Sequence, residues 1–370
     1  MKKVFLITLV MGLLMVVSAA LAAASMYTGV REAGMGGCGA SLSTGLPAVA
    51  YNPAGLMSGG NWAMDLSVGG SVKNFDQITG AINSFNDPTQ YLIDNYAKNL
   101  DANGSFFGQL GVDYNKIGLS LLIPNFQAQL SKPSNSIEGS VDAATRFDVV
   151  LTAGRTLALP ILPAKIDLGA SVKYIGYGYG RVNVVGALPT TADNTWGTGG
   201  GFGFDLGART EIAVPFVTTL AIGLAARDVA ASVTVNSPTT RTDTFNADGS
   251  VTKGTAVVGS AATYNYPMSL VLGCSGTVPV VGLGFAADIE SLSGGTGSLA
   301  STDSILHLGL EYPMWMNTLV LRAGTASGTD AKTTLGVAFK VPVATLQAAA
   351  VLDNSDSRDN SYVVGGGFSF

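Results

Sequence analysis

Residues 166–174 read IDLGASVKY and alternate strictly between two kinds of side chain. The even positions carry Ile, Leu, Ala, Val and Tyr, and the odd positions carry Asp, Gly, Ser and Lys. A repeat of two residues is typical of a β-strand with two different faces, whereas a helix repeats every 3.6 residues. The same alternation recurs in residues 204–212 (FDLGARTEI) and 281–290 (VGLGFAADIE). These stretches predict a sheet with one apolar face and one polar, glycine-rich face.

The alternating segments recur along most of the chain, and we count fourteen. They begin near Trp62, Phe106, Lys116, Arg146, Lys165, Phe202, Thr218, Pro267, Val281, Ile305, Thr318, Lys332, Thr345 and Ser361. Every second connection is long and polar, and these long connections cover residues 74–105, 124–145, 178–200, 229–265, 291–304, 325–331 and 354–360. The others are short, and most contain proline, which suits turns but not ladder interiors.

Alternating short and long connections are typical of bacterial outer-membrane barrels, which have short periplasmic turns and longer outer loops. We therefore predict an all-β chain, a 14-stranded antiparallel transmembrane β-barrel over residues 62–370, with an N-terminal hatch folded into the lumen. Both ends of the barrel chain should face the periplasm. A soluble β-sandwich would account for the two-residue repeat but not for the two classes of connection.

The composition agrees with a membrane barrel. Charged residues make up 12% of the chain, 48 residues are Gly, and the mean hydropathy is +0.36. Past the N-terminus the longest apolar stretch, residues 212–226, spans only about 15 residues, too few to cross a bilayer as a helix. A hydrophobic chain without helical spans crosses the bilayer as a closed barrel. The net charge of −5 and the lack of a basic patch argue against a nucleic-acid partner.

Both termini carry features of exported proteins. Residues 1–24 combine two lysines, an apolar run and small residues, which is typical of a secretory signal peptide. An uncleaved anchor is the alternative, and the missing cysteine at the cleavage site argues against a lipoprotein. The last segment ends in Phe370, and this terminal aromatic resembles the signal that outer-membrane barrels present to their assembly machinery. We expect a protein of the cell outer membrane, with outer-membrane lipid and the barrel assembly machinery as partners.

Residues 25–61 precede the first strand and contain GMGGCG at positions 34–39. These letters fit the G-x-G-x-x-G dinucleotide fingerprint, which also needs a buried strand before it, a helix after it and an acidic residue about 20 positions on. Residues 25–32 contain no apolar run, and residues 40–56 contain no Asp or Glu. A barrel of fourteen strands has a lumen too wide for its own side chains to fill. We therefore expect residues 25–61 to fold into the lumen as a plug.

Residues 29–57, GVREAGMGGCGASLSTGLPAVAYNPAGLM, resemble the N-terminal hatch of the FadL family of outer-membrane transporters for hydrophobic compounds. That family includes TodX-like aromatic-hydrocarbon channels and the related PorV proteins of bacterial secretion systems. The matching hatch residues are Gly34, Gly36, Gly37, Asn52, Pro53, Ala54 and Gly55. The resemblance implies diffusive passage of a hydrophobic small molecule, of the long-chain fatty acid or aromatic hydrocarbon type, past a shifting hatch and out sideways through the wall. It implies no cofactor and no metal.

The PorV relationship leaves an alternative open, an outer-membrane scaffold or shuttle with secreted-protein partners. Two charges in the otherwise uncharged hatch, Arg31 and Glu32, are candidates for a latch to charges of the lumen. Residues 76–100 place apolar side chains at helical spacing, as a lid on the barrel mouth or as a capture surface for an apolar ligand. The candidate capture residues are Ile78, Ile82, Phe85, Leu92 and Tyr96.

Few residues suggest catalysis. The chain has one histidine, His307, which we expect to be a hydrogen-bonding residue of the lumen or a pH-sensitive gate. Without a Ser-His-Asp grouping we expect no enzyme, and we expect Cys38 and Cys274 to be free thiols. Other lumen-side charges are expected to form cross-strand ion pairs. They are Asp65, Asp113, Lys116, Asp148, Asp167, Lys173, Asp205, Arg209, Glu211, Arg227, Asp288, Glu290, Arg322 and Lys340.

Overall fold

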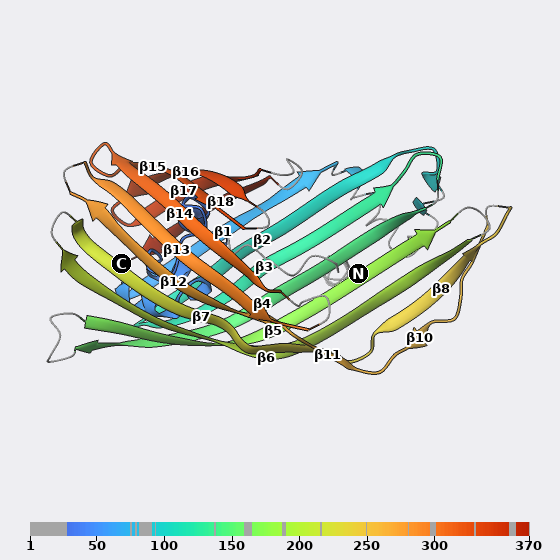
Figure 1. Ribbon diagram of the computed structural model, residues 1–370, viewed down its shortest axis with the longest axis horizontal. Helices are drawn as coiled ribbons and strands as arrows, with labels where there is room; N and C mark the ends of the chain where they lie inside the picture. Colours follow the sequence, from blue (N-terminus) through green and yellow to red (C-terminus); the bar gives the residue numbers. More distant parts are fainter. Residues whose placement is uncertain are drawn as a thin grey trace, which may run out of the picture.

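The computed structural model is a closed antiparallel β-barrel with residues 28–61 inside (Figure 1). Strand β1 (Trp62–Lys73) pairs with β2 (Leu100–Tyr114) on one side and with β18 (Ser361–Ser369) on the other, which closes the ring. The predicted signal, residues 1–24, and Phe370 lie outside the described residues. The structure describes residues 28–369 except 75, 78–79, 81–90, 93, 137, 159–164, 187–189, 215–216, 249, 280, 297–300, 329–330 and 355–359.

Fourteen long strands form the wall, each antiparallel to its neighbours, which confirms the predicted fold class and strand number. Besides β1, β2 and β18 they are β3 (Ile117–Lys132), β4 (Gly139–Ala158), β5 (Lys165–Val185), β6 (Thr190–Val214), β7 (Val217–Val235), β12 (Pro267–Val278), β13 (Leu283–Gly294), β14 (Asp303–Met314), β15 (Leu319–Ala326), β16 (Lys332–Val341) and β17 (Ala344–Asp353). The short connections lie with Trp62 and Ser369 at one end, here called the short-turn end. The opposite end is called the long-loop end.

Strands β3 to β7 are longer than the sequence predicted. Strand β6 has 25 residues, whereas a membrane-crossing strand needs about 9–11. The predicted loops 124–145 and 178–200 are mostly strand. In place of one long loop, residues 229–265 hold the end of β7 and the short strands β8 (Thr239–Phe245), β9 (Val251–Thr252), β10 (Val257–Val258) and β11 (Ala262–Asn265). The prediction of loops was wrong because polar residues alternate with Val, Ala and Tyr in these stretches. A strand that extends beyond the bilayer into water can expose polar side chains, so a polar sequence there does not exclude a strand.

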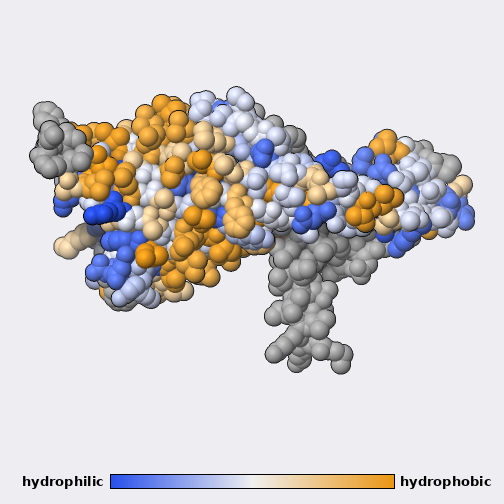
Figure 2. All heavy atoms as spheres, turned by 90° about the horizontal axis from the view of Figure 1, so that it is seen from below, coloured by the Kyte–Doolittle hydropathy of each residue, from blue (hydrophilic) through white to orange (hydrophobic). Residues whose placement is uncertain are grey.

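The wall turns its apolar face outward. On β5, Leu168, Val172 and Tyr174 are exposed, whereas Ser171 and Lys173 are each only 2% exposed. Figure 2 shows apolar residues gathered over one half of the molecule, while the elongated half is mostly hydrophilic. A closed ladder with such an apolar belt is a structure that can cross a lipid bilayer. No helix among the described residues is both long enough and apolar enough to span a membrane.

Residues 28–61, here called the N-terminal segment, lie inside the ring. They form one short α-helix and two 3-10 helices, α2 (Val30–Gly34), η1 (Leu46–Ala50) and η2 (Pro53–Ser58). Helix α2 contacts β15 to β18, η1 contacts β1 to β3, and η2 contacts β4 to β6. Because these strands surround the segment, it occupies the lumen at the short-turn end, where Figure 1 shows its helices within the ribbon of the barrel.

Candidate functional site

The GMGGCG stretch packs directly against the wall. Gly36 and Gly37 have positive φ values of 74° and 91°, a conformation that glycine adopts without strain. A Cβ atom on Gly36 would lie 2.4 Å from the carbonyl oxygen of Leu308 on β14, and one on Gly324 of β15 would lie 2.3 Å from the Gly36 nitrogen. This contact leaves no space for a phosphate. The two glycines therefore allow backbone to approach backbone, and they do not form a nucleotide cradle.

Side chains of the wall hold the same stretch by its backbone. The Gly36 N–H donates to Thr334 Oγ1 on β16 at 2.9 Å, and His307 Nδ1 on β14 donates to the Gly36 carbonyl at 2.7 Å. On β13, Asp288 Oδ2 accepts from the N–H groups of Gly39 and Ala40 at 2.7 and 2.8 Å. All these partners sit on strand positions, so the wall holds this stretch by hydrogen bonds.

Asn52 links two parts of the segment to each other and to the wall. Its Oδ1 accepts from the Ala54 N–H at 3.1 Å, which caps η2, and Pro53 occupies the first position of that helix. Its Nδ2 donates to the carbonyls of Ala40, at 2.6 Å, and Ala208 on β6, at 3.1 Å. Gly55 adds a backbone hydrogen bond within the segment, because its carbonyl accepts from the Gly45 N–H. The Asn-Pro-Ala-Gly motif is thus a structural joint of the segment.

The two predicted latch residues behave differently. Arg31 reaches the wall and donates to both carboxylate oxygens of Glu311 on β14, at 2.5 and 3.2 Å, and to the Leu42 carbonyl at 3.2 Å. Glu32 is buried and accepts from Ser43 within the segment itself. Glu311 also accepts from Arg322 on β15 at 3.2 Å. The ion pair between segment and wall is therefore formed by Arg31 alone.

A layer of buried charges crosses the lumen above the segment. Arg146 on β4 pairs with Asp148 and Asp228, both at 2.7 Å, and Lys173 on β5 pairs with Asp205 and Asp228, also at 2.7 Å. Asp228 was not among the residues expected in the lumen. It stands in a bulge where β7 carries one extra residue relative to β6, and it has a positive φ of 54°. Nothing in the local sequence marks this bulge, so the residue had no assigned face.

A second group of charges connects the wall to the segment. Arg227 on β7 pairs with Glu290 on β13, and His307 Nε2 lies 3.2 Å from the same carboxylate. The other nitrogen of His307 holds the Gly36 carbonyl, so the single histidine bridges the wall and the segment. Cys38 and Cys274 are both unpaired, as expected.

An aromatic cluster lies on the long-loop side of the charge layer. Ile175, Tyr177 and Tyr266 are buried there together with alanines of β4 and valines of β7, and Phe126, Tyr179 and Tyr264 pack against them. The guanidinium of Arg146 stacks over the Tyr266 ring, 4.3 Å from its centroid. Going from the segment toward the long loops, the lumen therefore changes from backbone contacts to charges and then to aromatic rings.

The pairing of strand β3 with both of its neighbours is irregular beside this cluster. Ile123 and Pro124 have no register partner on β4, since the pairing jumps from Leu122 to Asn125, and the pairing with β2 shifts at the same place. Proline has no N–H to donate to a ladder, so it favours such a break. The ladder of the wall is irregular at this point.

The predicted capture loop is described only in part. Ile78, Ile82 and Phe85 lie outside the described residues. Leu92 is fully buried in a cluster that includes Leu100, Leu130 and Phe245, whereas Tyr96 is 46% exposed. The described part of this loop therefore packs onto the wall at the long-loop end, on strand positions such as Val182 and Val184 that share a face with the outward-pointing Val172 and Tyr174.

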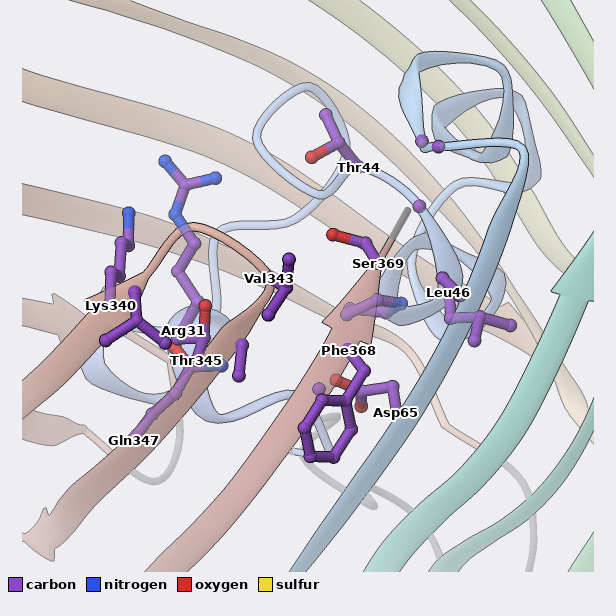
Figure 3. A pocket seen from close by; sticks show the side chains of 18 of the residues that line it. Arg31, Thr44, Leu46, Asp65, Lys340, Val343, Thr345, Gln347, Phe368 and Ser369 are labelled. Atoms are coloured by element: carbon purple, nitrogen blue, oxygen red, sulfur yellow. The ribbon is translucent and has the colours of Figure 1, made fainter.

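A cavity of about 670 Å³ lies at the short-turn end between the N-terminal segment and the wall (Figure 3). Its segment side includes Arg31, Glu32 and residues 44–47, and its wall side comes from β1 and β15 to β18. We call it the hatch cavity. Among the described residues, no group of three or more His, Cys, Asp or Glu side chains could hold a metal ion.

Comparison with solved structures identifies the fold. The toluene transporter TodX of P. putida superposes with a TM-score of 0.61 at 13% identity, covering 92% of this chain and 98% of that one. The chain has the FadL-type barrel fold. The toluene transporter TbuX of Ralstonia pickettii (TM-score 0.56, 12% identity, 92% and 98% covered) and a FadL homologue of Pseudomonas aeruginosa (0.58, 10%, 96% and 99%) are similar to it as well. No family model and no curated protein matches the sequence.

Proposed function

We propose that the chain is an outer-membrane channel for diffusive passage of hydrophobic small molecules, with the N-terminal segment as its hatch. The observation that carries the proposal is the way in which the lumen is closed. A segment held by side-chain hydrogen bonds and one ion pair can shift while the ladder of the barrel stays intact. The similarity to barrels described as toluene transporters supports a cargo of the aromatic hydrocarbon or fatty acid type.

The proposed route starts at the long-loop end, which we assign to the outside of the cell. A hydrophobic molecule enters the lumen there and reaches the aromatic cluster around Tyr177 and Tyr266, whose rings offer apolar contact. The layer of buried charges lies between this cluster and the N-terminal segment. Movement of an apolar molecule past this layer is unfavourable, because apolar groups cannot hydrogen-bond to the charged side chains. The break in β3 at Pro124 supports a sideways exit into the membrane at this level.

Two other functions have less support. The proteins named above are transporters, and they do not support the scaffold alternative for secreted proteins. Catalysis by a Ser-His pair would need a histidine that is free to accept a proton from serine. His307 is instead engaged at both nitrogens, with the Gly36 carbonyl and with Glu290. We infer that the chain is not an enzyme.

A structure determined in the presence of toluene or a long-chain fatty acid tests this proposal. We expect the ligand in the lumen, in contact with the aromatic cluster and above the Arg146–Asp228 ion pair. Replacing Tyr177 with Asp should abolish this density, since a charge there disfavours an apolar ligand. An empty lumen at saturating ligand, with the barrel intact, would contradict a transport function.

A further inference from the structure

The last residue of strand β3, at the long-loop end, is a buried lysine. Lys132 is only 1% exposed and is among the largest side chains that the fold buries completely. None of the ion pairs among the described residues includes it. A lysine is almost never fully buried unless its charge has partners. The ammonium of Lys132 therefore depends on acceptors that are not carboxylates.

Four backbone carbonyls surround this ammonium. Lys132 Nζ donates to the carbonyl oxygens of Tyr96 and Lys98, at 3.0 and 2.8 Å. It also donates to those of Pro133 and Ser136, at 3.0 and 2.9 Å. An ammonium has three N–H groups and no acceptor, so four carbonyls are enough to engage all of its donors. Two of the carbonyls belong to the loop before β2 and two to the connection between β3 and β4, so one side chain joins two separate loops.

The first of these loops covers an apolar surface on the outside of the wall. Its residues 91–92 and 94–99 are here called the strap. Leu92 of the strap is 0% exposed and packs with strand residues of the long-loop end. These strand residues are Leu100, Ala102, Leu130, Val182, Val184, Ala192 and Phe245. Because Val182 and Val184 share a face of β5 with the outward-pointing Tyr174, the strap separates part of the outer wall from water.

Two kinds of contact keep the strap on the wall. Burial of Leu92 is favourable but has no preferred direction. The hydrogen bonds of the ammonium are directional, and a charged donor contributes more than a neutral one. The only other printed bond between the strap and the β3–β4 connection is a neutral one, from the Asn135 N–H to the Tyr96 carbonyl at 2.9 Å. The position of the strap therefore depends mainly on Leu92 and Lys132.

We propose that Lys132 is the clasp of the strap. The strap is closed while its carbonyls accept from the Lys132 ammonium, and it opens when these hydrogen bonds break, which uncovers an apolar surface on the outside of the wall. Donation by the N–H groups keeps it closed, and neither the positive charge alone nor the packing of the lysine stem is sufficient. The clasp does not depend on what crosses the lumen, so its test is separate from that of the proposed transport.

Chymotrypsin cleavage after Tyr96, followed by mass spectrometry on the full-length barrel in nonionic detergent, measures how often the strap is open. The Tyr96 side chain is accessible at 46% exposure, and its carbonyl is one of the four acceptors. We expect Lys132→Met and Lys132→Ala to speed this cleavage about tenfold or more, because each removes all the charge-assisted hydrogen bonds. Lys332→Met is the matched control, since Lys332 begins β16 at the same end and pairs with Asp353 at 3.3 Å. Its rate should equal that of the native chain.

Chemical rescue distinguishes a clasp from a lysine that only fills space. Lys132→Ala lacks three methylenes and the ammonium, which together correspond to propylammonium. Added propylammonium can enter while the strap is open, and it should restore most of the protection of Lys132→Ala. Tetramethylammonium at the same concentration carries the same charge but has no N–H, so it should not protect. Lys132→Met should respond to neither cation, because its side chain fills the space.

Heat-dependent electrophoretic mobility shows that each variant barrel is folded before it is cleaved. Three results would overturn the proposal: cleavage of folded Lys132→Met at the native rate, equal acceleration in Lys332→Met, or protection of Lys132→Ala by propylammonium that is no better than by tetramethylammonium. Faster cleavage of both Lys132 variants, with rescue of Lys132→Ala by propylammonium alone, supports it.

Discussion

Replacing Glu311 with glutamine should release the N-terminal segment more than replacing its partner Arg31. Glu311 is the single carboxylate that Arg31 and Arg322 share, at 2.5 and 3.2 Å. Its neutralisation removes the counter-charge that three neighbouring cations, Lys340 included, share. Arg31→Gln, in contrast, leaves Glu311 still bonded to Arg322. The two variants remove the same ion pair, but only the first also leaves like charges facing each other.

The expected size follows from the burial of the pair. Removing one partner of a fully buried ion pair is unfavourable by about 3–5 kcal/mol. The side chains of Arg31 and Glu311 are 28% and 15% exposed, so solvent screens part of this interaction. We expect about 2 kcal/mol for Glu311→Gln, which corresponds to a roughly 30-fold larger open population, and less than about tenfold for Arg31→Gln.

Cys38 provides the assay, because it lies within the segment and is 0% exposed. Burial and then the neighbouring Asp288 carboxylate raise the pKa of its thiol, so the reactive thiolate is disfavoured while the segment is in place. With Cys274 replaced by serine, the rate of maleimide labelling at Cys38 reports how often the segment leaves the wall. The rate should rise about 30-fold in Glu311→Gln, in proportion to the open population.

The control variant is Asp167→Asn, a carboxylate on β5 whose side chain accepts from Thr156 and forms no hydrogen bond or ion pair with the described residues of the segment. Its labelling rate should equal that of the parent. Heat-dependent electrophoretic mobility confirms that each barrel is folded. A labelling rate for Glu311→Gln within twofold of the parent, or one below that for Arg31→Gln, would refute the reasoning.

Two further predictions concern the glycine contact of the segment and the loop at Leu92. Gly36→Val should expose Cys38 to maleimide in a folded barrel, since its Cβ would lie 2.4 Å from the Leu308 carbonyl oxygen and its φ of 74° is strained for valine; labelling at the parent rate would show that the glycine contact is dispensable. Leu92→Asp buries an unpaired charge in the cluster around Leu92 and should speed tryptic cleavage after Lys98 by about tenfold or more; unchanged cleavage would show that Leu92 does not hold this loop on the wall.

The strands could be predicted because each one has two chemically different faces. In residues 166–174 every apolar side chain lies on one face, and the structure turns that face outward. The limits of the strands could not be predicted in the same way. In β6 most of the first ten or so residues are polar, and only their pairing with β5 and β8 shows that they belong to the strand. Alternating apolar residues identify the part of a strand that lies in the membrane. Where the same strand continues into water the alternation is absent, so its end cannot be recognised from the sequence.

The contacts of the N-terminal segment depend on tertiary structure. The glycines and the Asn-Pro-Ala motif marked residues 34–55, but their partners come from strands more than 150 residues away, such as Asp288 and His307. From the sequence we expected Arg31 and Glu32 to act together as a latch. The structure shows that Arg31 reaches Glu311, whereas Glu32 bonds to Ser43. Asp228 was missed because a bulge, invisible in the local pattern, turns it into the lumen.

The central claim, a barrel that passes hydrophobic molecules and excludes polar ones, is tested most directly by flux into liposomes that contain the purified chain. Radiolabelled toluene or oleate trapped by an internal acceptor should enter faster than in liposomes without protein, while a polar solute of similar size, such as glucose, should not. Flux of toluene equal to that of empty liposomes, or entry of glucose at the same rate as toluene, would contradict the account.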